Sequence, residues 1–223
     1  TSDGGGTQYQ LNVVAGTVWN NGGVIAAYDF ERDQPIRADQ RSYLSNMVGA
    51  NTIQPGIRRH SLFGSSHLEL APNLLIGVDA LYNARSSTLV SATTLNSNEA
   101  HLSSNVIAVA PRIEFTAGAG WSFTAAGGFA ADDTRFKNRI RSPSGTLLAI
   151  TTGCYCNESR SLELGGEGPL LELPGGSVRL AAGVGYRENS MTLETNDDRQ
   201  HGRRKSFFGY SEIMIPLVDG GNN

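Results

Sequence analysis

The feature that most constrains the fold is the alternation of side chains between Ser161 and Glu188. In the second half of this stretch, every second residue is apolar: Val178, Leu180, Ala182, Val184 and Tyr186. Because successive side chains of a strand point to opposite faces, a period of two predicts strands. The Pro174-Gly175-Gly176 sequence between the two halves predicts a turn. We therefore expect a hairpin with one apolar face and one face of charged residues and glycine.

Such a hairpin fits two environments. A soluble sandwich would bury the apolar face and leave the polar face in water. An outer-membrane barrel would turn the apolar face to lipid and the charged face to a wet lumen. The chain has 223 residues and a net charge of −3, so no basic surface favours a nucleic-acid partner. No apolar run approaches the ~18 to 20 residues of a membrane helix.

The alternation recurs along the chain, with short turns and long connections in regular order. Short turns are expected near Asn21, Pro72, Gly118 and Gly175, and long loops at about 33–57, 86–104, 134–158 and 195–205. A last strand is expected over residues 207–218. Up-and-down outer-membrane barrels have tight periplasmic turns and long outer loops, whereas Greek-key sandwiches mix connection lengths at both ends. The pattern therefore favours the barrel, with the turns in the periplasm and the loops outside.

Aromatic residues support the barrel. Trp19 and Trp121 lie beside short turns, and a second group lies at the loop ends of the apolar faces: Tyr28, Phe30, Tyr82, Phe129 and Tyr186. Lipid interfaces select two such bands, although aromatic residues favour strands in general. The sequence predicts an all-β, antiparallel, up-and-down transmembrane barrel segment of about nine strands.

Several segments together resemble the barrel of TonB-dependent outer-membrane receptors. They are Arg59–Gly64, Leu68–Asn73, Val78–Tyr82, Gly168–Arg187 and Tyr210–Val218. Their order and spacing carry the resemblance, which covers nearly the whole chain. It implies a segment of a receptor in the outer membrane of a Gram-negative bacterium. Such a receptor imports a scarce small-molecule ligand, such as a siderophore, vitamin or saccharide, with energy from the inner membrane.

The chain also departs from that family. Such receptors carry an N-terminal plug, a short motif that engages the TonB complex, and a barrel of about 22 strands. Residues 1–223 contain no plug-like stretch, and the glycine-rich opening suggests a mature product or a piece of something longer. Open sheet edges in lipid leave backbone groups unpaired. We therefore expect residues 8–18 and 207–218 to pair with further barrel strands, and a plug to fill the lumen. Both would come from a second chain or from another part of the same receptor.

Side-chain parity assigns residues to the two faces. Leu74, Ile76, Val78, Leu162, Leu164, Leu180 and Val184 are expected to face lipid. The charged residues of the other parity are the candidates for docking a plug or lining a solute path: Asp29, Glu31, Glu69, Asp79, Arg112, Glu114, Glu163, Glu167, Arg179, Arg187 and Glu212. For any one of them, a hydrated wall whose charges satisfy one another is the simpler interpretation. For the set as a whole, we expect that these residues dock a plug.

Cys154 and Cys156 are expected in a long loop, where a disulfide would pin a loop tip on the cell exterior. Free thiols are the alternative, and the sequence leaves both open.

The sequence offers no pattern for catalysis or for a cofactor. Histidines 60, 67, 101 and 201 are scattered without metal-ligand spacing. The glycine-rich segments are not followed by helices, and no Gly-x-Ser-x-Gly occurs. We therefore expect no enzyme, metal or cofactor. The alternatives to an energised importer are a passive outer-membrane pore and a self-contained structural or adhesive β domain.

Overall fold

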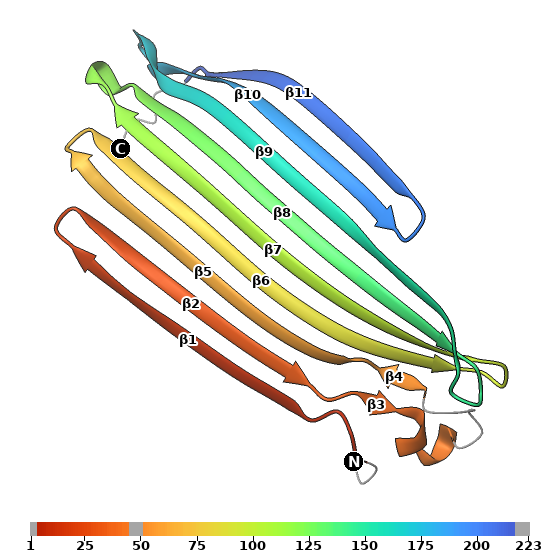
Figure 1. Cartoon of the computed structure of the whole chain (residues 1–223). Helices are drawn as coiled ribbons and strands as arrows, with labels where there is room; N and C mark the ends of the chain where they lie inside the picture. The colour runs from red at the N-terminus through yellow and green to blue at the C-terminus, as the bar shows by residue number, and fades with distance from the viewer. Residues whose placement is uncertain (1–3, 45–50, 217–223) are drawn as a thin grey trace.

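The computed structural model describes residues 4–44 and 51–216, most of which form one open antiparallel sheet (Figure 1). Its nine strands lie side by side in chain order. They are β1 (Gln8–Trp19), β2 (Gly22–Asp33), β5 (Gly56–Ala71), β6 (Leu74–Ala92), β7 (Ser97–Thr116), β8 (Ser122–Arg141), β9 (Leu147–Leu173), β10 (Gly176–Thr195) and β11 (Arg199–Met214). The predicted all-β, up-and-down architecture of about nine strands is confirmed.

The remaining elements are small. Between β2 and β5 lie the paired strands β3 (Ile36–Arg37) and β4 (Thr52–Gln54), and the 3-10 turns η1 (Ala38–Gln40) and η2 (Ser42–Leu44). A third 3-10 turn, η3 (Gly118–Gly120), joins β7 to β8. Within the described ranges, no helix is long and apolar enough to cross a membrane.

The sheet is a single layer, so it has almost no core of its own. Among the described hydrophobic residues, only Ala38, Cys154 and Val178 are buried. Large apolar side chains stay open instead: Leu162 is 53% exposed and Val184 is 60% exposed. An apolar sheet face needs another layer against it. No described residue supplies that layer. Whatever covers the apolar face therefore lies outside the described part of the chain.

The strand register sorts the side chains into two faces, because directly opposed residues of an antiparallel pair lie on the same side. Leu162 opposes Tyr186, which opposes Phe207, and this row belongs to the face that we call the apolar face. Ser161, Arg187 and Ser206 form the adjacent row on the opposite side, the polar face. All the residues expected to face lipid share the apolar face: Leu74, Ile76, Val78, Leu162, Leu164, Leu180 and Val184.

Aromatic residues mark both ends of a band on the apolar face. At the end with the tight β1–β2, β5–β6, β7–β8 and β9–β10 connections, which we call the turn end, lie Trp19 and Trp121. Trp121 stacks on Phe123 with ring centroids 6.0 Å apart. The other border is formed by Tyr28, Phe30, Tyr82, Phe129 and Tyr186. From Trp121 to Phe129 is eight residues, or about 26 Å along the strand.

Three of the four predicted long loops are wrong, because most of their residues belong to strands. Residues 86–104 lie in β6 and β7 except for 93–96. Residues 134–158 lie in β8 and β9 except for 142–146. Residues 195–205 lie in β10 and β11 except for 196–198, so the last strand begins at Arg199. Only the 33–57 connection lies mostly outside the nine-stranded sheet where it is described, although short strands and 3-10 turns occupy much of it. Its predicted centre, Asn46, lies outside the described residues.

The physical reason for this error is the loss of hydrophobic contrast. Beyond the aromatic border both faces of a strand carry Ser, Thr, Asn and charged residues, so the period-two signal disappears from the sequence. The backbone ladder nevertheless continues, as the unbroken pairing of β6 with β7 from Ser86 to Ala92 shows. The sheet therefore extends far past the band at the end opposite the turns, which we call the loop end.

Both edges of the sheet are open. Within the described residues, β1 pairs only with β2 and β11 only with β10, so the two edge strands do not pair with each other. Both run toward the turn end, as an odd number of antiparallel strands requires (Figure 1). Their outer backbone groups thus find no partner in this part of the chain, as expected from the sequence. Leu217 and Val218, predicted to end the last strand, lie outside the described residues.

Two glycines of β10 accommodate aromatic rings of β11 on the polar face. Gly183 opposes Tyr210 and Gly185 opposes Phe208. A Cβ at Gly183 would lie 2.5 Å from the Tyr210 ring, and one at Gly185 would overlap the Phe208 ring. These glycines let the rings lie flat across the strand, a cross-strand arrangement that stabilises sheets.

We expect Gly185→Ala to lower the free energy of unfolding by about 1–3 kcal/mol, since Phe208 would have to leave its position. The matched control is Gly202→Ala on the same face of β11, where an added Cβ meets nothing within 4 Å. Urea titration of both variants measures the difference. Equal stability of the two variants would contradict the packing argument.

Candidate functional site

The candidate site is the polar face, and all of the charged residues proposed from the sequence lie on it. They are Asp29, Glu31, Glu69, Asp79, Arg112, Glu114, Glu163, Glu167, Arg179, Arg187 and Glu212. The register brings them together from seven strands into a few groups on one surface. Their common side follows from parity, but their pairing could not be read from the sequence.

The first group joins β2 to β5. The Arg59 guanidinium lies 3.0 Å from Asp29 and 2.8 Å from Glu31. From β1, Gln8 donates a hydrogen bond to Glu31 at 3.0 Å, and Gln10 donates one to Asp29 at 3.4 Å. Arg59 was not among the predicted site residues, although its odd parity in β5 would have indicated this face. The two acids are thus largely engaged within the sheet.

The second group lies on β6 and β7. The Arg112 guanidinium is 3.2 Å from Asp79 and 3.2 Å from Glu114. It lies over Gly77, where an added Cβ would come within 3.1 Å of its Cζ. The three charged side chains are each 38–50% exposed, so water screens their pairing. This group, like the first, has one arginine shared between two acids.

Toward the turn end, the polar face forms an acid-lined hollow of about 460 Å³. Glu114, Glu163 and Glu167 line it together with Tyr210. The Tyr210 hydroxyl donates a hydrogen bond to Glu163 at 3.1 Å, and Arg179 lies 3.6 Å from Glu167. Tyr210 was missed from the sequence, although it has the same parity as Glu212 and therefore belongs to the same face. The hollow is open and carries more acids than cations.

Three of the glutamates predicted as site residues have no cationic partner in the part of the chain that the structure describes. Glu69, Glu163 and Glu212 form no ion pair there, although Glu163 accepts the Tyr210 hydrogen bond. All three lie in the half of the polar face nearer the turns. Arg187, in contrast, lies 5.9 Å from the centroid of the Phe208 ring. The polar face can therefore attract positive charge most strongly near the turn end.

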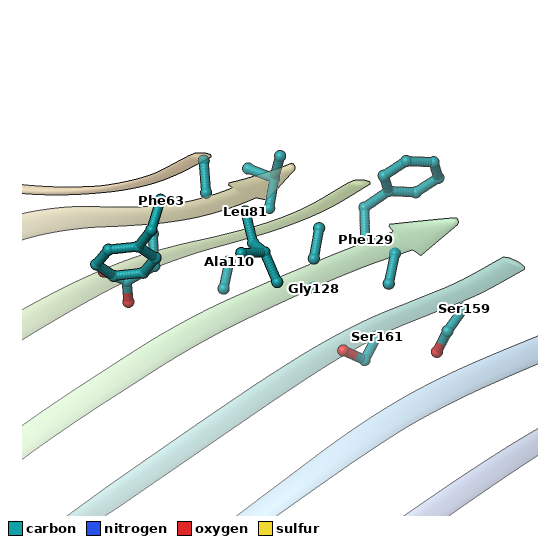
Figure 2. A pocket seen from close by; sticks show the side chains of 12 residues that line it. Phe63, Leu81, Ala110, Gly128, Phe129, Ser159 and Ser161 are labelled. Carbon is teal, nitrogen blue, oxygen red and sulfur yellow. The ribbon is translucent and has the colours of Figure 1, made fainter. Parts of the chain in front are cut away.

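A second hollow, of about 280 Å³, lies in the middle of the sheet (Figure 2). Small residues form its polar-face floor, among them Ala110, Gly128 and Ser161, and Phe63 and Leu81 project beside them. Figure 2 shows Phe129 on the other side of the sheet from Phe63, in agreement with the strand parity. Small side chains let another surface approach the backbone closely, so this tract offers shape to a partner and little charge.

The histidines do not converge. His60 forms a hydrogen bond with Tyr28, His101 with Thr88 and His201 with Thr192, each with the neighbouring strand. Asp133, Cys154 and Cys156 do offer ligand atoms within 4.8 Å of one another. Both sulfurs are joined in a disulfide, however, so neither is available as a thiolate ligand.

The disulfide does not lie where the sequence suggested. Cys154 and Cys156 belong to β9, on the apolar-face side, opposite Arg135 and Asp133 of β8. Their Cα atoms are 5.5 Å apart, which is short for alternate residues of an extended strand. The bond thus spans two positions of one strand and does not pin a loop tip.

Comparison with known proteins supports the fold. No protein-family model matches the chain, and no curated protein matches it. Among solved structures, the ferric yersiniabactin uptake receptor FyuA from Yersinia pestis is similar, with a TM-score of 0.56 and 10% sequence identity. The match covers 92% of this chain and 34% of FyuA, so the chain spans about a third of that receptor's length. At this identity the likeness shows a shared fold: the sheet is shaped like part of a large receptor barrel.

We expect the polar-face ion pairs to contribute little to stability. Arg112→Gln removes both contacts of the second group, yet these side chains are half exposed, so the free energy of unfolding should fall by about 0.2–1 kcal/mol. Urea titration beside the wild type measures the change. A loss of several kcal/mol would mean that this group holds the sheet together and is not available to a partner.

Proposed function

We propose that this chain forms part of the barrel wall of a TonB-dependent receptor in the outer membrane of a Gram-negative bacterium. Such a receptor imports a scarce small molecule with energy delivered from the inner membrane. The likeness to an uptake receptor supports a transport role, and no catalytic role is proposed. The ligand itself is left open, because its recognition depends on surfaces beyond this chain.

The observation that carries the proposal is the division of the sheet into two unlike faces. The apolar face is an exposed band, bordered by aromatic residues that lie eight residues apart along β8, near the about 9–11 residues with which a tilted strand crosses a membrane. Outer-membrane barrels carry an outward apolar band of about 25 Å between two aromatic girdles. The polar face carries charged groups that water in a lumen would solvate. A single layer with these two faces fits a wall between lipid and water.

The open edges support partner strands. Unpaired backbone groups cost free energy in hydrocarbon, and only closed barrels avoid them. In the proposal, further strands continue the sheet beyond β1 and β11, and a plug occupies the space enclosed by the wall. The uncompensated glutamates Glu69, Glu163 and Glu212 are the proposed docking points for positively charged plug residues. The acid-lined hollow and the tract of small residues provide room for that contact.

The band predicts opposite effects for arginine at two adjacent positions of β10. Ala182 lies on the apolar face and Ala181 on the polar face, where it opposes Glu167 and Glu212. Ala182→Arg should destabilise the membrane-inserted protein by about 2–4 kcal/mol. Ala181→Arg places a cation between two acids and should cost far less. Unfolding titrations in lipid vesicles compare them, and equal costs would contradict the assignment of the faces.

The turn end is proposed to lie in the periplasm and the loop end outside the cell. We expect Ser144→Cys, in the β8–β9 connection, to react with a membrane-impermeant thiol reagent on intact cells. Gly118→Cys, in the β7–β8 turn, should react only after the outer membrane is permeabilised. The two native cysteines are bonded to each other and give no background. Labelling of residue 118 alone on intact cells would reverse the orientation.

Hydrogen exchange at the two edge strands, β1 and β11, tests whether further strands complete the barrel. In the assembled receptor, the amides of β1 and β11 should exchange with deuterium as slowly as those of the central strands β7 and β8, since both edges are then paired. Rapid exchange along one side of β1 or β11 would show a free edge. If the chain is instead a soluble monomer without detergent, a self-contained β domain replaces the receptor segment.

A further inference from the structure

The charged residues beyond the aromatic border are divided unequally between the two sides of the sheet. On the apolar-face side of β8 to β11 lie the basic residues that we call the cationic rim: Arg135, Lys137, Arg139, Arg141, Arg160, Arg199, Arg203 and Lys205. Fewer acids share this surface: Asp133, Glu158, Glu188 and Glu194. The polar face of the whole sheet has the opposite balance, with more acids than arginines.

The strand register gives the height of the rim. Leu162, Tyr186 and Phe207 form the row at the aromatic border. The next row outward, which holds the border residue Phe129, also contains Arg160, Glu188 and Lys205, and the row after it contains Glu158 and Arg203. Rows on one face are two residues apart, or about 7 Å along the strand. Basic side chains thus begin in the outer row of the border, beside Phe129, which is the level of lipid head groups in the proposed membrane placement.

Local contacts leave a surplus of positive charge in this rim. Glu188 pairs with both Arg203 and Lys205, so one acid serves two cations. Arg160 pairs with Glu158 and lies 6.0 Å from the centroid of the Phe129 ring. Arg135 and Lys137 also have no acidic partner within the described ranges, but they lie six and eight residues beyond Phe129, or about 20 and 26 Å along the strand. Near the border, Arg203 and Lys205 share one acid and so keep donors for an anion, and guanidinium groups match phosphate geometry well.

We propose that the cationic rim binds the phosphate groups of lipids in the outward leaflet of the membrane. The proposal rests on the membrane placement above and goes beyond it, because it assigns a lipid class to one surface. The rim is continuous with the apolar band on the same side of the same strands. A single lipid can therefore place its acyl chains against the band and its phosphate against Lys205 or Arg203, which lie one and two rows beyond Tyr186. A soluble anion would not contact the apolar band together with the rim, and a solute in the lumen would lie on the other side of the sheet.

The test compares lipid retention by single variants of the assembled protein. The protein is inserted into phosphatidylcholine vesicles that contain a phosphorylated glucosamine lipid or its dephosphorylated form. It is then extracted in mild detergent, and the retained lipid is counted by native mass spectrometry. The wild type should retain the phosphorylated form in preference. Arg203→Gln should reduce that preference about fivefold.

The matched control is Arg204→Gln, one residue away but on the polar face, which should retain lipid like the wild type. Lys205→Gln, in the row next to the border, serves as a second test, and in each rim variant Glu188 keeps its other cationic partner. If both rim variants retain as much phosphorylated lipid as Arg204→Gln, or the wild type has no preference, the rim does not bind phosphate, although the membrane placement stands. Failure of the wild type to enter vesicles at all would overturn both proposals.

Discussion

The structure depends on one constraint: it is a single layer of strands, held together mainly by the backbone hydrogen bonds between neighbouring strands. No second layer covers either face within the described residues, so cross-strand contacts replace a core. Register is therefore decisive, since a shift by one residue would exchange the two faces. The irregularities lie near the strand ends, at Glu69/Ala71, Ile140/Arg141 and Val178/Arg179. The long middle stays in phase, which keeps the apolar band and the charged groups on opposite sides.

The two faces solve the same packing problem in different ways. On the apolar face, Trp121 lies across Gly168 and Phe123 across Gly166. On the polar face, Tyr210 and Phe208 lie across Gly183 and Gly185. In each case an aromatic ring fills the space that a missing side chain leaves on the neighbouring strand. This explains why glycine is abundant in strands where it would otherwise weaken the sheet.

Sequence patterns were sufficient to predict the part of the sheet in which one face is apolar. There, alternation such as Val178 to Tyr186 gave the strands, the turns and the face of each charged residue. It was insufficient beyond the aromatic border, where the Ser86–Thr88 and Arg199–Lys205 segments are strands without hydrophobic contrast. The ion pairs between strands could not be predicted from the sequence either. Arg59 contacts Asp29 and Glu31 only because of the way β2 and β5 align, and that alignment depends on the connection between them.

The extension of the strands past the aromatic border has a mechanical consequence. From Phe129 to the end of β8 is twelve residues, or about 40 Å of hydrogen-bonded strand. Flexible loops of that length would lose much conformational entropy whenever they closed on a ligand. Hydrogen-bonded strands, which are already ordered, lost most of this conformational entropy during folding. In the proposed receptor, the outer part of the wall would act as a stiff collar that holds its short tips at a set distance from the bilayer.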